Sequence, residues 1–502
     1  MITKGKLTAA AVLAAIGGTA LCSCTADSDL IHITPYVQDQ AQQGVTTASV
    51  ADNVTTTAEM DIMTTTTEES TTTTTTTTTS PVLRGNIYDC NKTLITYSTR
   101  TEDGGEERHF TDGYKYSFGN IISQYSAGID TELEETLRTV NPSAVDGDEK
   151  VGQSIQLTID GEMQNALYNY MESMGMVGSV VVLRTDGSLM AEVSYPSYDP
   201  MLYAADSTYV DTLSYGALAN KAFQNNPPGS CFKIMSEVVA DMNGITCLYD
   251  EGTWEVDGAT IVNWDHDTGW YPVEERTLYS AFVNSSNIFF AKAFDQIGAD
   301  KAISDLESVF HFLSPIYCDF GPMENNFEIF SNDDLRRSAF GQSNVRTCPI
   351  YLAALGREAV FGDMVKPFVV HSIVDTNDPN SEVFPGTAPY DWIASIPVDY
   401  RQNLLDGMSG VGGNLGMYVP ENYRFYAKTG TAETGGEDIL YITGVLQNVN
   451  DGSFNEAVWS DYSEYNGSYV IVMQLQNPNA FEFNFASESV ALYQGLINTV
   501  VG

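Results

Sequence analysis

The chain has 502 residues, of which 43% are hydrophobic, so it can bury a large core and is long enough for about two to four domains. Its formal net charge is −43 at pH 7, with 66 acidic side chains against 23 lysines and arginines. Nucleic-acid binding depends on clustered Lys and Arg, so this charge excludes nucleic acid from the expected partners.

Cysteine and histidine are few and scattered. The sequence has seven cysteines and five histidines, without an HExxH motif or Cys/His pairs at metal-ligand spacing. The cysteines beyond residue 24 do not have the spacing of a disulfide framework. We therefore expect no metal and no cofactor.

Residues 1–24 have the pattern of an export signal. Lys4 and Lys6 form a basic start, and the apolar run over 7–21 is short for a membrane span of about 20 residues but typical of a signal peptide. Leu-Cys-Ser-Cys at its end resembles a bacterial lipobox, which implies lipidation of Cys24. The alternative is an uncleaved membrane anchor. Both alternatives place the rest of the chain at the extracytoplasmic face of the cell membrane.

A threonine-rich segment follows. Residues 25–83 include nine consecutive threonines and offer little apolar surface to bury, so we expect a disordered linker that tethers the rest of the chain. Order should begin at residue 84, where two short strand-like runs flank a turn at Asn91-Lys92. Residues 84–151 are polar with weak periodicity and are expected to form a small N-terminal pedestal domain.

Residues 152–502 are expected to form the main domain. A helix is predicted over 161–174, with its apolar face made of Met163, Ala166, Leu167, Tyr170 and Met174. A hairpin is predicted from the runs 180–183 and 189–193 around Asp186-Gly187. Further elements are predicted as a strand at 153–160, strands at 422–433, 439–448 and 468–477, and a closing helix over 487–501. This order predicts an α+β fold: a single antiparallel sheet whose strands are split by a long helical insertion.

The stretch NNPPGSCFKIMSEVVADMNG, Asn225 to Gly244, joins a loop to an apolar helix. A helix starting at Ser230 places Lys233 beside it, because residues three apart are neighbours on a helix. The hydroxyl then has an amine within reach, and N–H groups of the helix N-terminus can face a developing oxyanion. The alternative is that Ser230 is only a helix cap. The other face of this helix is expected in the core, with Cys231, Met235, Val238 and Met242.

Lys233 can act as a base only when its amine is neutral. Lowering a lysine pKa from about 10.4 to about 7 costs roughly 4–5 kcal/mol. Burial and a second nearby cation both favour the neutral form. The nucleophile hypothesis therefore requires a second lysine in the site.

Two further motifs supply the missing groups. Ser285-Ser286-Asn287 stands at the start of another apolar helix pattern, and Lys428-Thr429-Gly430-Thr431 stands in a predicted strand. Lys428 is the required second cation. Gly430 lets another backbone approach the strand, which suits an extended peptide at the sheet edge. The order SxxK, SxN, KTG is typical of penicillin-binding proteins and class A β-lactamases.

From about Arg84 to its C-terminus the sequence resembles the class B penicillin-binding proteins. Beyond the three motifs, the likeness is carried by RGNIYDCN, LTIDGEMQNA, VVVLRTDGSLMAEVSYPSYDP, NNPPGSCFK and FGQSNVRTCPIYLAAL. The resemblance implies the penicillin-binding transpeptidase fold, an antiparallel five-stranded sheet with helices on both faces and a helical insertion. It also implies a serine-type D-Ala-D-Ala transpeptidase of peptidoglycan synthesis. We find no room for a glycosyltransferase domain in the chain, so we expect a separate glycosyltransferase partner rather than a bifunctional class A enzyme.

The resemblance implies a nucleophile, a base and a proton relay. Ser230 attacks the D-Ala–D-Ala carbonyl of a stem peptide, or the ring of a β-lactam, while Lys233 takes its proton. Ser285 passes a proton towards the leaving group. Asn287 holds both the substrate amide and Lys233.

The resemblance also implies a binding strand. Lys428 provides positive potential, and Thr429 and Thr431, which flank Gly430, bind the terminal carboxylate. The N–H groups of Thr431 and Ser230 form the oxyanion hole.

Some residues depart from the family pattern. Cys231 and Phe232 fill the interior of SxxK, where threonine is usual at the first place, and we expect Cys231 to be a buried packing residue. Cys90 stands where arginine is common. Trp264-Asp265-His266 is either a surface loop or part of the substrate groove.

Other functions compete with cross-linking. The first alternative is a D,D-carboxypeptidase or β-lactamase, although the sequence shows no deacylating glutamate loop after SxN. The second is a non-catalytic β-lactam sensor or scaffold, although sensors usually carry membrane spans and a signalling domain. The expected ligands are peptidoglycan stem peptides and β-lactams.

Overall fold

The computed structural model describes residues 81–502, except 123–127, 145–148, 267–272, 451–461, 463–464 and 478–484. The predictions for residues 1–80, which include the export signal, Cys24 and nearly all of the linker, lie outside the described residues. Within the described ranges, no helix is both long enough and apolar enough to cross a membrane.

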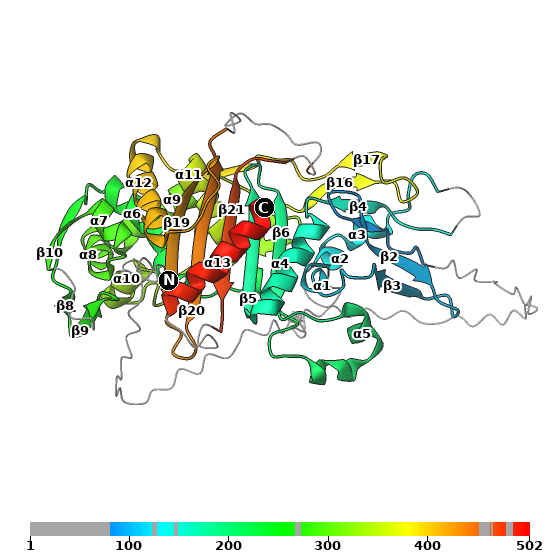
Figure 1. Ribbon diagram of the computed structural model, residues 1–502, viewed down its shortest axis with the longest axis horizontal. Helices are drawn as coiled ribbons and strands as arrows, with labels where there is room; N and C mark the ends of the chain where they lie inside the picture. Colours follow the sequence, from blue (N-terminus) through cyan, green and yellow to red (C-terminus); the bar gives the residue numbers. More distant parts are fainter. Residues whose placement is uncertain are drawn as a thin grey trace, which may run out of the picture. The chain divides into compact units, whose positions relative to one another are not determined.

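A five-stranded antiparallel sheet forms the centre of the described residues (Figure 1). The strand order is β19-β20-β21-β5-β6. Their bounds are β5 Gly178–Arg184, β6 Leu189–Tyr195, β19 Tyr423–Ala432, β20 Ile439–Asn448 and β21 Tyr469–Leu475. The predicted hairpin is confirmed, and Gly187 in its turn has a φ of 95°. The predicted α+β fold, with two early and three late strands in one sheet, is confirmed.

Helices cover both faces of this sheet. α4 and α13 pack on one face and α11 on the other, and Figure 1 shows α13 crossing the strands. Their bounds are α4 Gly161–Met174, α11 Pro349–Phe361 and α13 Phe485–Val501. Along β5, Val180 and Val182 join the cluster under α4 and α13, whereas Val181 and Leu183 join the opposite core. Successive side chains of a strand point to opposite faces, so a strand covered on both sides is apolar throughout.

The predicted helix at 161–174 is present as α4, but its buried face is rotated from the predicted one. Leu167 is buried as predicted, whereas Met174 is 45% exposed. The buried positions are Gly161, Gln164, Leu167, Tyr168 and Met171. Gln164 is buried because its Nε2 donates to the carbonyls of Ser117 and Glu192. A polar residue on the core face obscures the hydrophobic periodicity from which the face was predicted.

A second sheet has six strands in the order β17-β16-β4-β1-β2-β3. The bounds are β1 Ile87–Tyr88, β2 Leu94–Arg100, β3 Glu106–Phe110, β4 Ser154–Leu157, β16 Val370–Val374 and β17 Glu382–Pro385. The predicted turn at Asn91-Lys92 joins β1 to β2, and Lys92 has a φ of 65°. Strands from both sides of residue 151 share this sheet, and the division into a pedestal and a main domain stays a prediction. The short helices after β3 are α1 Gly119–Ile122, α2 Ile129–Glu132 and α3 Glu134–Arg138.

Between β6 and β19 the chain forms the predicted helical insertion, interrupted by short strand pairs. The remaining helices are α5 Pro200–Ala205, α6 Lys233–Met242, α7 Leu278–Val283, α8 Asn287–Ile297, α9 Ala299–Phe310, α10 Asn332–Ser338 and α12 Val398–Leu415. The strand pairs are β7 Cys247–Asp250 with β10 Glu274–Thr277, β8 Thr253–Val256 with β9 Ala259–Val262, β11 Ile316–Cys318 with β12 Gly321–Met323, β13 Asn326–Phe327 with β14 Val345–Arg346, and β15 Asp363–Val365 with β18 Trp392–Ser395. α8 contacts both α6 and β7, which brings the motif-bearing segments together.

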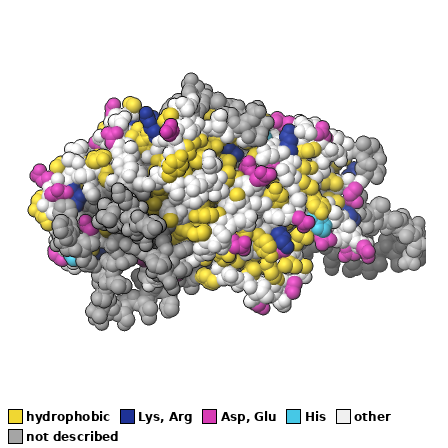
Figure 2. All heavy atoms as spheres, in the orientation of Figure 1, with side chains coloured by type: hydrophobic (Ala, Val, Ile, Leu, Met, Phe, Trp, Pro, Cys, Tyr) yellow, Lys and Arg dark blue, Asp and Glu magenta, His cyan; other side chains and the backbone are white. Residues whose placement is uncertain are grey.

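Charged side chains of the described residues are scattered over the face shown in Figure 2. On the face in Figure 2, the visible Lys and Arg side chains of the described residues stand apart from one another, among many Asp and Glu side chains. That face therefore presents no continuous basic surface to a polyanion.

Candidate active site

Ser230 lies in the 3₁₀ turn η4 (Gly229–Phe232), directly before α6. The α-helix thus begins at Lys233, one turn later than predicted. Ser230 is half-buried. The apolar face predicted for this helix is in the core, with Cys231, Met235 and Val238 fully buried and Met242 partly buried. This packing fixes the turn that carries the Ser230 hydroxyl.

The fully buried Lys233 side chain makes four polar contacts. Its Nζ donates to the Ser285 carbonyl at 2.7 Å and to Asn287 Oδ1 at 2.7 Å. It lies 2.9 Å from Ser230 Oγ and 3.1 Å from Ser285 Oγ. The structure therefore brings the SxxK and SxN motifs together, and all four partners of the amine are uncharged oxygens.

These contacts fit a neutral amine, which has two N–H donors and one lone pair. The Ser285 carbonyl and Asn287 Oδ1 can only accept, so they take the two N–H groups of neutral Lys233. The lone pair is then left facing the hydroxyls of Ser230 and Ser285. Burial and the charge of nearby Lys428 hold the pKa of Lys233 well below its usual value, and Asp250 opposes this shift. The geometry and the lowered pKa both suit a general base.

Strand β19 places the second lysine, Lys428, next to the Ser285 hydroxyl, which Lys233 also contacts. Lys428 Nζ lies 3.1 Å from Ser285 Oγ and donates to the Thr429 carbonyl at 3.0 Å. The Lys428 side chain is buried, and burial lowers its pKa to about 8. The structure thus places Lys428 where the sequence required a second cation, with Ser285 Oγ between the two amines.

The turn η4 and strand β19 approach each other closely through glycines. A Cβ on Gly430 would lie 2.7 Å from the Pro228 carbonyl oxygen, and a Cβ on Gly229 would lie 2.2 Å from the Thr431 carbonyl oxygen. The backbone that approaches Gly430 is therefore the chain's own, whereas the sequence suggested a bound peptide there. β19 is an edge strand of the sheet, with Thr429 half-buried and Thr431 exposed.

Cys231 lies behind the reactive side chains as a packing residue. Thr443 Oγ1 donates to its Sγ at 3.8 Å. Burial raises the pKa of the Cys231 thiol to about 11. A protonated, fully buried thiol is a poor nucleophile, which agrees with the packing interpretation.

The loop with Trp264 is tied to the SxN motif. Trp264 is half-buried, and its Nε1 donates to the carbonyl of Asn284 at 2.9 Å. Asn284 directly precedes Ser285, so this loop borders the site. Its continuation over 267–272 lies outside the described residues.

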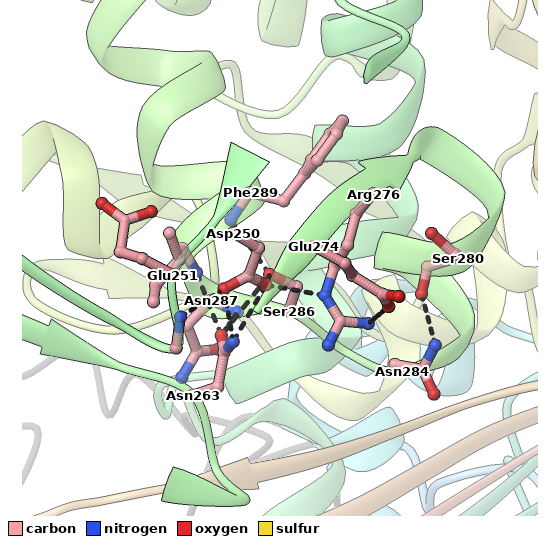
Figure 3. Close-up of polar contacts among 12 residues, drawn as sticks. Asp250, Glu251, Asn263, Glu274, Arg276, Ser280, Asn284, Ser286, Asn287 and Phe289 are labelled. Carbon is pink, nitrogen blue, oxygen red and sulfur yellow. Dashed lines mark hydrogen bonds and ion pairs between the residues drawn. The ribbon is translucent and has the colours of Figure 1, made fainter. Parts of the chain in front are cut away.

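Sequence reasoning missed a buried polar cluster behind SxN. Asp250, Asn263, Arg276 and Ser286 are each at most 3% exposed. Figure 3 shows Asp250, Asn263 and Ser286 converging beside Asn287. The sequence drew attention to Trp264, next to Asn263, but isolated Asp and Asn residues form no motif. In the part of the chain that the structure describes, no group of three or more His, Cys, Asp and Glu side chains could hold a metal ion.

Comparisons with known proteins indicate the family of this chain. The family model described as penicillin binding protein transpeptidase domain matches residues 178–490. Penicillin-binding protein 3 of Bacillus subtilis is 25% identical over 357 residues, which cover 65% of this chain and 48% of that protein. Peptidoglycan D,D-transpeptidase PbpA of Mycobacterium tuberculosis is 26% identical over 366 residues, which cover 68% of this chain and 69% of PbpA. The chain thus spans about half the length of the first relative.

Solved structures agree on the fold. Penicillin-binding protein A from M. tuberculosis, solved as an imipenem acyl-enzyme complex, superposes with a TM-score of 0.69 at 20% identity, covering 84% of this chain and 99% of that one. The D,D-transpeptidase domain of a peptidoglycan glycosyltransferase from Eggerthella lenta gives 0.66 at 21% identity, covering 84% and 98%. These likenesses confirm the predicted transpeptidase fold. Because the family model matches more than half of its residues, this chain belongs to the penicillin-binding protein transpeptidase domain family.

Proposed function

We propose that this chain is a peptidoglycan D,D-transpeptidase that forms an acyl-enzyme on Ser230, and that β-lactams acylate the same residue. The observation that carries the proposal is the 2.9 Å distance between Ser230 Oγ and the amine of Lys233, which is buried among uncharged oxygens. Relatives named D,D-transpeptidase and a neighbour solved as an acyl-enzyme support it.

In the first step Ser230 Oγ bonds to the carbonyl carbon of the penultimate D-Ala, and Lys233 accepts the hydroxyl proton. The bond from this carbon to the nitrogen of the terminal D-Ala then breaks, and a proton passes through Ser285 Oγ to that nitrogen. The 3.1 Å contact between Ser285 Oγ and Lys233 Nζ supports this relay. The products are an ester on Ser230 and free D-Ala.

In the second step the amine of another stem peptide attacks the ester carbonyl. The amine gives a proton to Lys233, the new peptide bond forms, and Ser230 Oγ leaves and recovers a proton. With a β-lactam, the ring amide is opened and its nitrogen stays attached to the acyl group. The contacts described for Ser230 and Lys233 include no carboxylate that could activate water, so the penicilloyl ester should persist.

We assign substrate binding to β19. Lys428 supplies positive potential, while Thr429 and Thr431, flanking Gly430, bind the terminal carboxylate. The N–H groups of Ser230 and Thr431 form the oxyanion hole, and the close approach of Gly229 to Thr431 supports this pairing. Asn287 orients the substrate amide as well as Lys233.

The proposal extends to the rest of the chain. Residues 1–24 export the protein and anchor it, through lipidated Cys24 or as a membrane segment, and residues 25–83 are a tether. Residues 84–151 form a pedestal and 152–502 the transpeptidase domain, at the extracytoplasmic face of the membrane. A separate glycosyltransferase supplies the glycan strands.

The test is to incubate the protein with a fluorescent penicillin and to map the labelled peptide by mass spectrometry. We expect one label, on Ser230, and none in Ser230→Ala. Labelling of Ser230→Ala at the wild-type rate would show that another residue is the nucleophile.

A second measurement separates cross-linking from related activities. We expect the penicilloyl-enzyme mass to persist for many minutes and D-amino acids to be incorporated from a D-Ala-D-Ala-type thioester donor. Rapid return of free enzyme with excess opened penicillin would identify a β-lactamase. Stable acylation without exchange on any donor would identify a sensor.

A further inference from the structure

A buried hydrogen-bond cluster connects three separate segments behind the SxN motif (Figure 3). Asp250 ends β7, Asn263 follows β9, and Ser286 precedes α8. Their side chains are fully or almost fully buried. Since polar side chains are costly to bury without partners, the contacts of each one indicate what the cluster holds in place.

Asp250 is the centre of the cluster. Its carboxylate accepts from Asn263 Nδ2 at 2.9 Å on both oxygens, from Ser286 Oγ at 2.6 Å and from the Gly252 N–H at 2.9 Å. Arg276 from β10 forms an ion pair with it at 2.8 Å. The strand pair β7–β10 therefore holds the Asp250 carboxylate in place, and the carboxylate in turn fixes the side chains of Asn263 and Ser286.

Asn263 links Asp250 to Asn287 through hydrogen bonds. Its Oδ1 accepts from the Asn287 N–H at 2.8 Å and from the Ile288 N–H at 3.2 Å. The neighbouring Val262 carbonyl accepts from Asn287 Nδ2 at 2.9 Å. Because Nδ2 is committed to Val262, Oδ1 of Asn287 is the atom left to face Lys233, at 2.7 Å.

Ser286 fixes the Ser285 carbonyl, which is the other acceptor of the Lys233 amine. Its hydroxyl donates to Asp250 and accepts from the Phe289 N–H at 3.0 Å, as the N-cap of α8. This holds the turn in which Ser285 adopts a φ of 56°, a conformation that a non-glycine residue keeps only when its surroundings enforce it. In that turn the Ser285 carbonyl lies 2.7 Å from Lys233 Nζ.

We infer that Asp250 and Asn263 are positioning residues for acylation: through Ser286 and Asn287 they hold the two acceptors that direct the lone pair of Lys233 at the Ser230 hydroxyl. The inference rests on the proposed function, in which Lys233 is the base. Asp250 and Asn263 do not touch the reacting atoms themselves.

The test compares Asp250→Asn, Ser286→Ala and the double variant. Fluorescent-penicillin kinetics, normalised to the fraction finally acylated, separate the acylation rate constant from the initial binding constant. We expect each single variant to lose about tenfold or more in the rate constant, because small displacements of a reacting group are costly, with binding changed by less than about threefold. The double variant should lose less than the product of the two single losses, because both single variants disturb the hydrogen bond from Ser286 to Asp250.

Asp130→Asn is the matched control. Asp130 is also a buried carboxylate in an ion pair, with Arg108 at 2.9 Å, but it belongs to residues 84–151, here called the N-terminal segment. It should lower the melting temperature without changing the acylation rate constant.

A wild-type rate constant in folded Asp250→Asn overturns the inference. If Asp250→Asn does not fold, a wild-type rate constant in Ser286→Ala overturns it. An equal loss in Asp130→Asn also overturns it, because destabilisation alone would then explain the effect. Failure of the wild-type protein to be labelled on Ser230 would instead remove the proposed function, and this inference with it.

Discussion

The N-terminal segment and the reaction centre bury cations in opposite ways. In the N-terminal segment, Arg108 pairs with Asp130 at 2.9 Å, and both side chains are at most 5% exposed. Lys115, whose side chain is 41% exposed, pairs with the buried carboxylate of Asp199 at 2.7 Å. In the reaction centre, Lys233 and Lys428 are at least as deeply buried as Arg108 but bond to hydroxyl, carbonyl and amide oxygens.

The consequence is a difference in protonation. The hydrogen bond to Asp199 raises the pKa of Lys115, so its charge is secured. Burial lowers the pKa of Lys428 to about 8 and, together with the charge of Lys428, holds the pKa of Lys233 well below its usual value. The Asp199 carboxylate favours the charged form of the partly exposed Lys115, whereas burial without a carboxylate partner favours the neutral, basic form of the two lysines in the reaction centre.

The largest expected effect comes from removing the base. Lys233→Met should lower the rate of penicillin acylation by about 10²–10⁴-fold, the usual range for a general base, while non-covalent binding persists. Stopped-flow labelling with a fluorescent penicillin measures both quantities.

Lys221 offers a matched control for this change. It is another buried lysine, and burial lowers its pKa to about 7. Its Nζ donates to the carbonyls of Pro196 at 3.0 Å and Gly216 at 2.7 Å, and among the described residues it has no hydroxyl as a hydrogen-bond partner. Lys221→Met should leave the acylation rate unchanged. Equal losses in the two variants would mean that burial of a lysine, rather than its position, is what matters.

The next effect is on stability in the N-terminal segment. Asp130→Asn leaves Arg108 buried without its charge partner and should lower the free energy of unfolding by about 3–5 kcal/mol. Urea unfolding followed by fluorescence measures the loss. A change below about 1 kcal/mol would contradict the structural role given to this pair.

A smaller effect is expected from the second lysine of the centre. The charge of Lys428 disfavours protonation of Lys233, so Lys428→Gln should raise the pKa of Lys233. Because acylation needs neutral Lys233, the acid limb of the acylation rate should move to higher pH. The pH profile of penicillin labelling tests this, and an acid limb that stays in place or moves to lower pH would show that Lys428 does not tune the base.

The smallest effect is expected at an exposed ion pair. Glu134 and Arg138, one helical turn apart, are 39% and 30% exposed, so solvent screens their attraction. Glu134→Gln should lower the free energy of unfolding by about 1 kcal/mol or less. Glu134 also pairs with the largely buried Arg84 at 2.5 Å, and a loss as large as that of Asp130→Asn would show that this second ion pair supports the fold.

Local sequence signals predicted the helices and strands well where the spacing of apolar residues and the positions of turn residues agree. The hairpin around Gly187 follows from two apolar runs and a turn, and the segment after Ser230 follows from an apolar helical face. The buried face of α4 was misassigned because Gln164 is held in the core by hydrogen bonds to Ser117 and Glu192, which no hydrophobic period shows.

The candidate site likewise has one part that the sequence predicts and another that it does not. The sequence by itself determined that Ser230 and Lys233 are neighbours, because one helical turn joins them, and that Lys428 to Thr431 lie on one strand. Only the tertiary structure decided that Ser285 stands between the two amines, since those contacts span 52 and 143 residues of chain. The same holds for Asp250 and Asn263: their hydrogen bonds join segments 13 to 36 residues apart within the insertion, and no local periodicity encodes that arrangement.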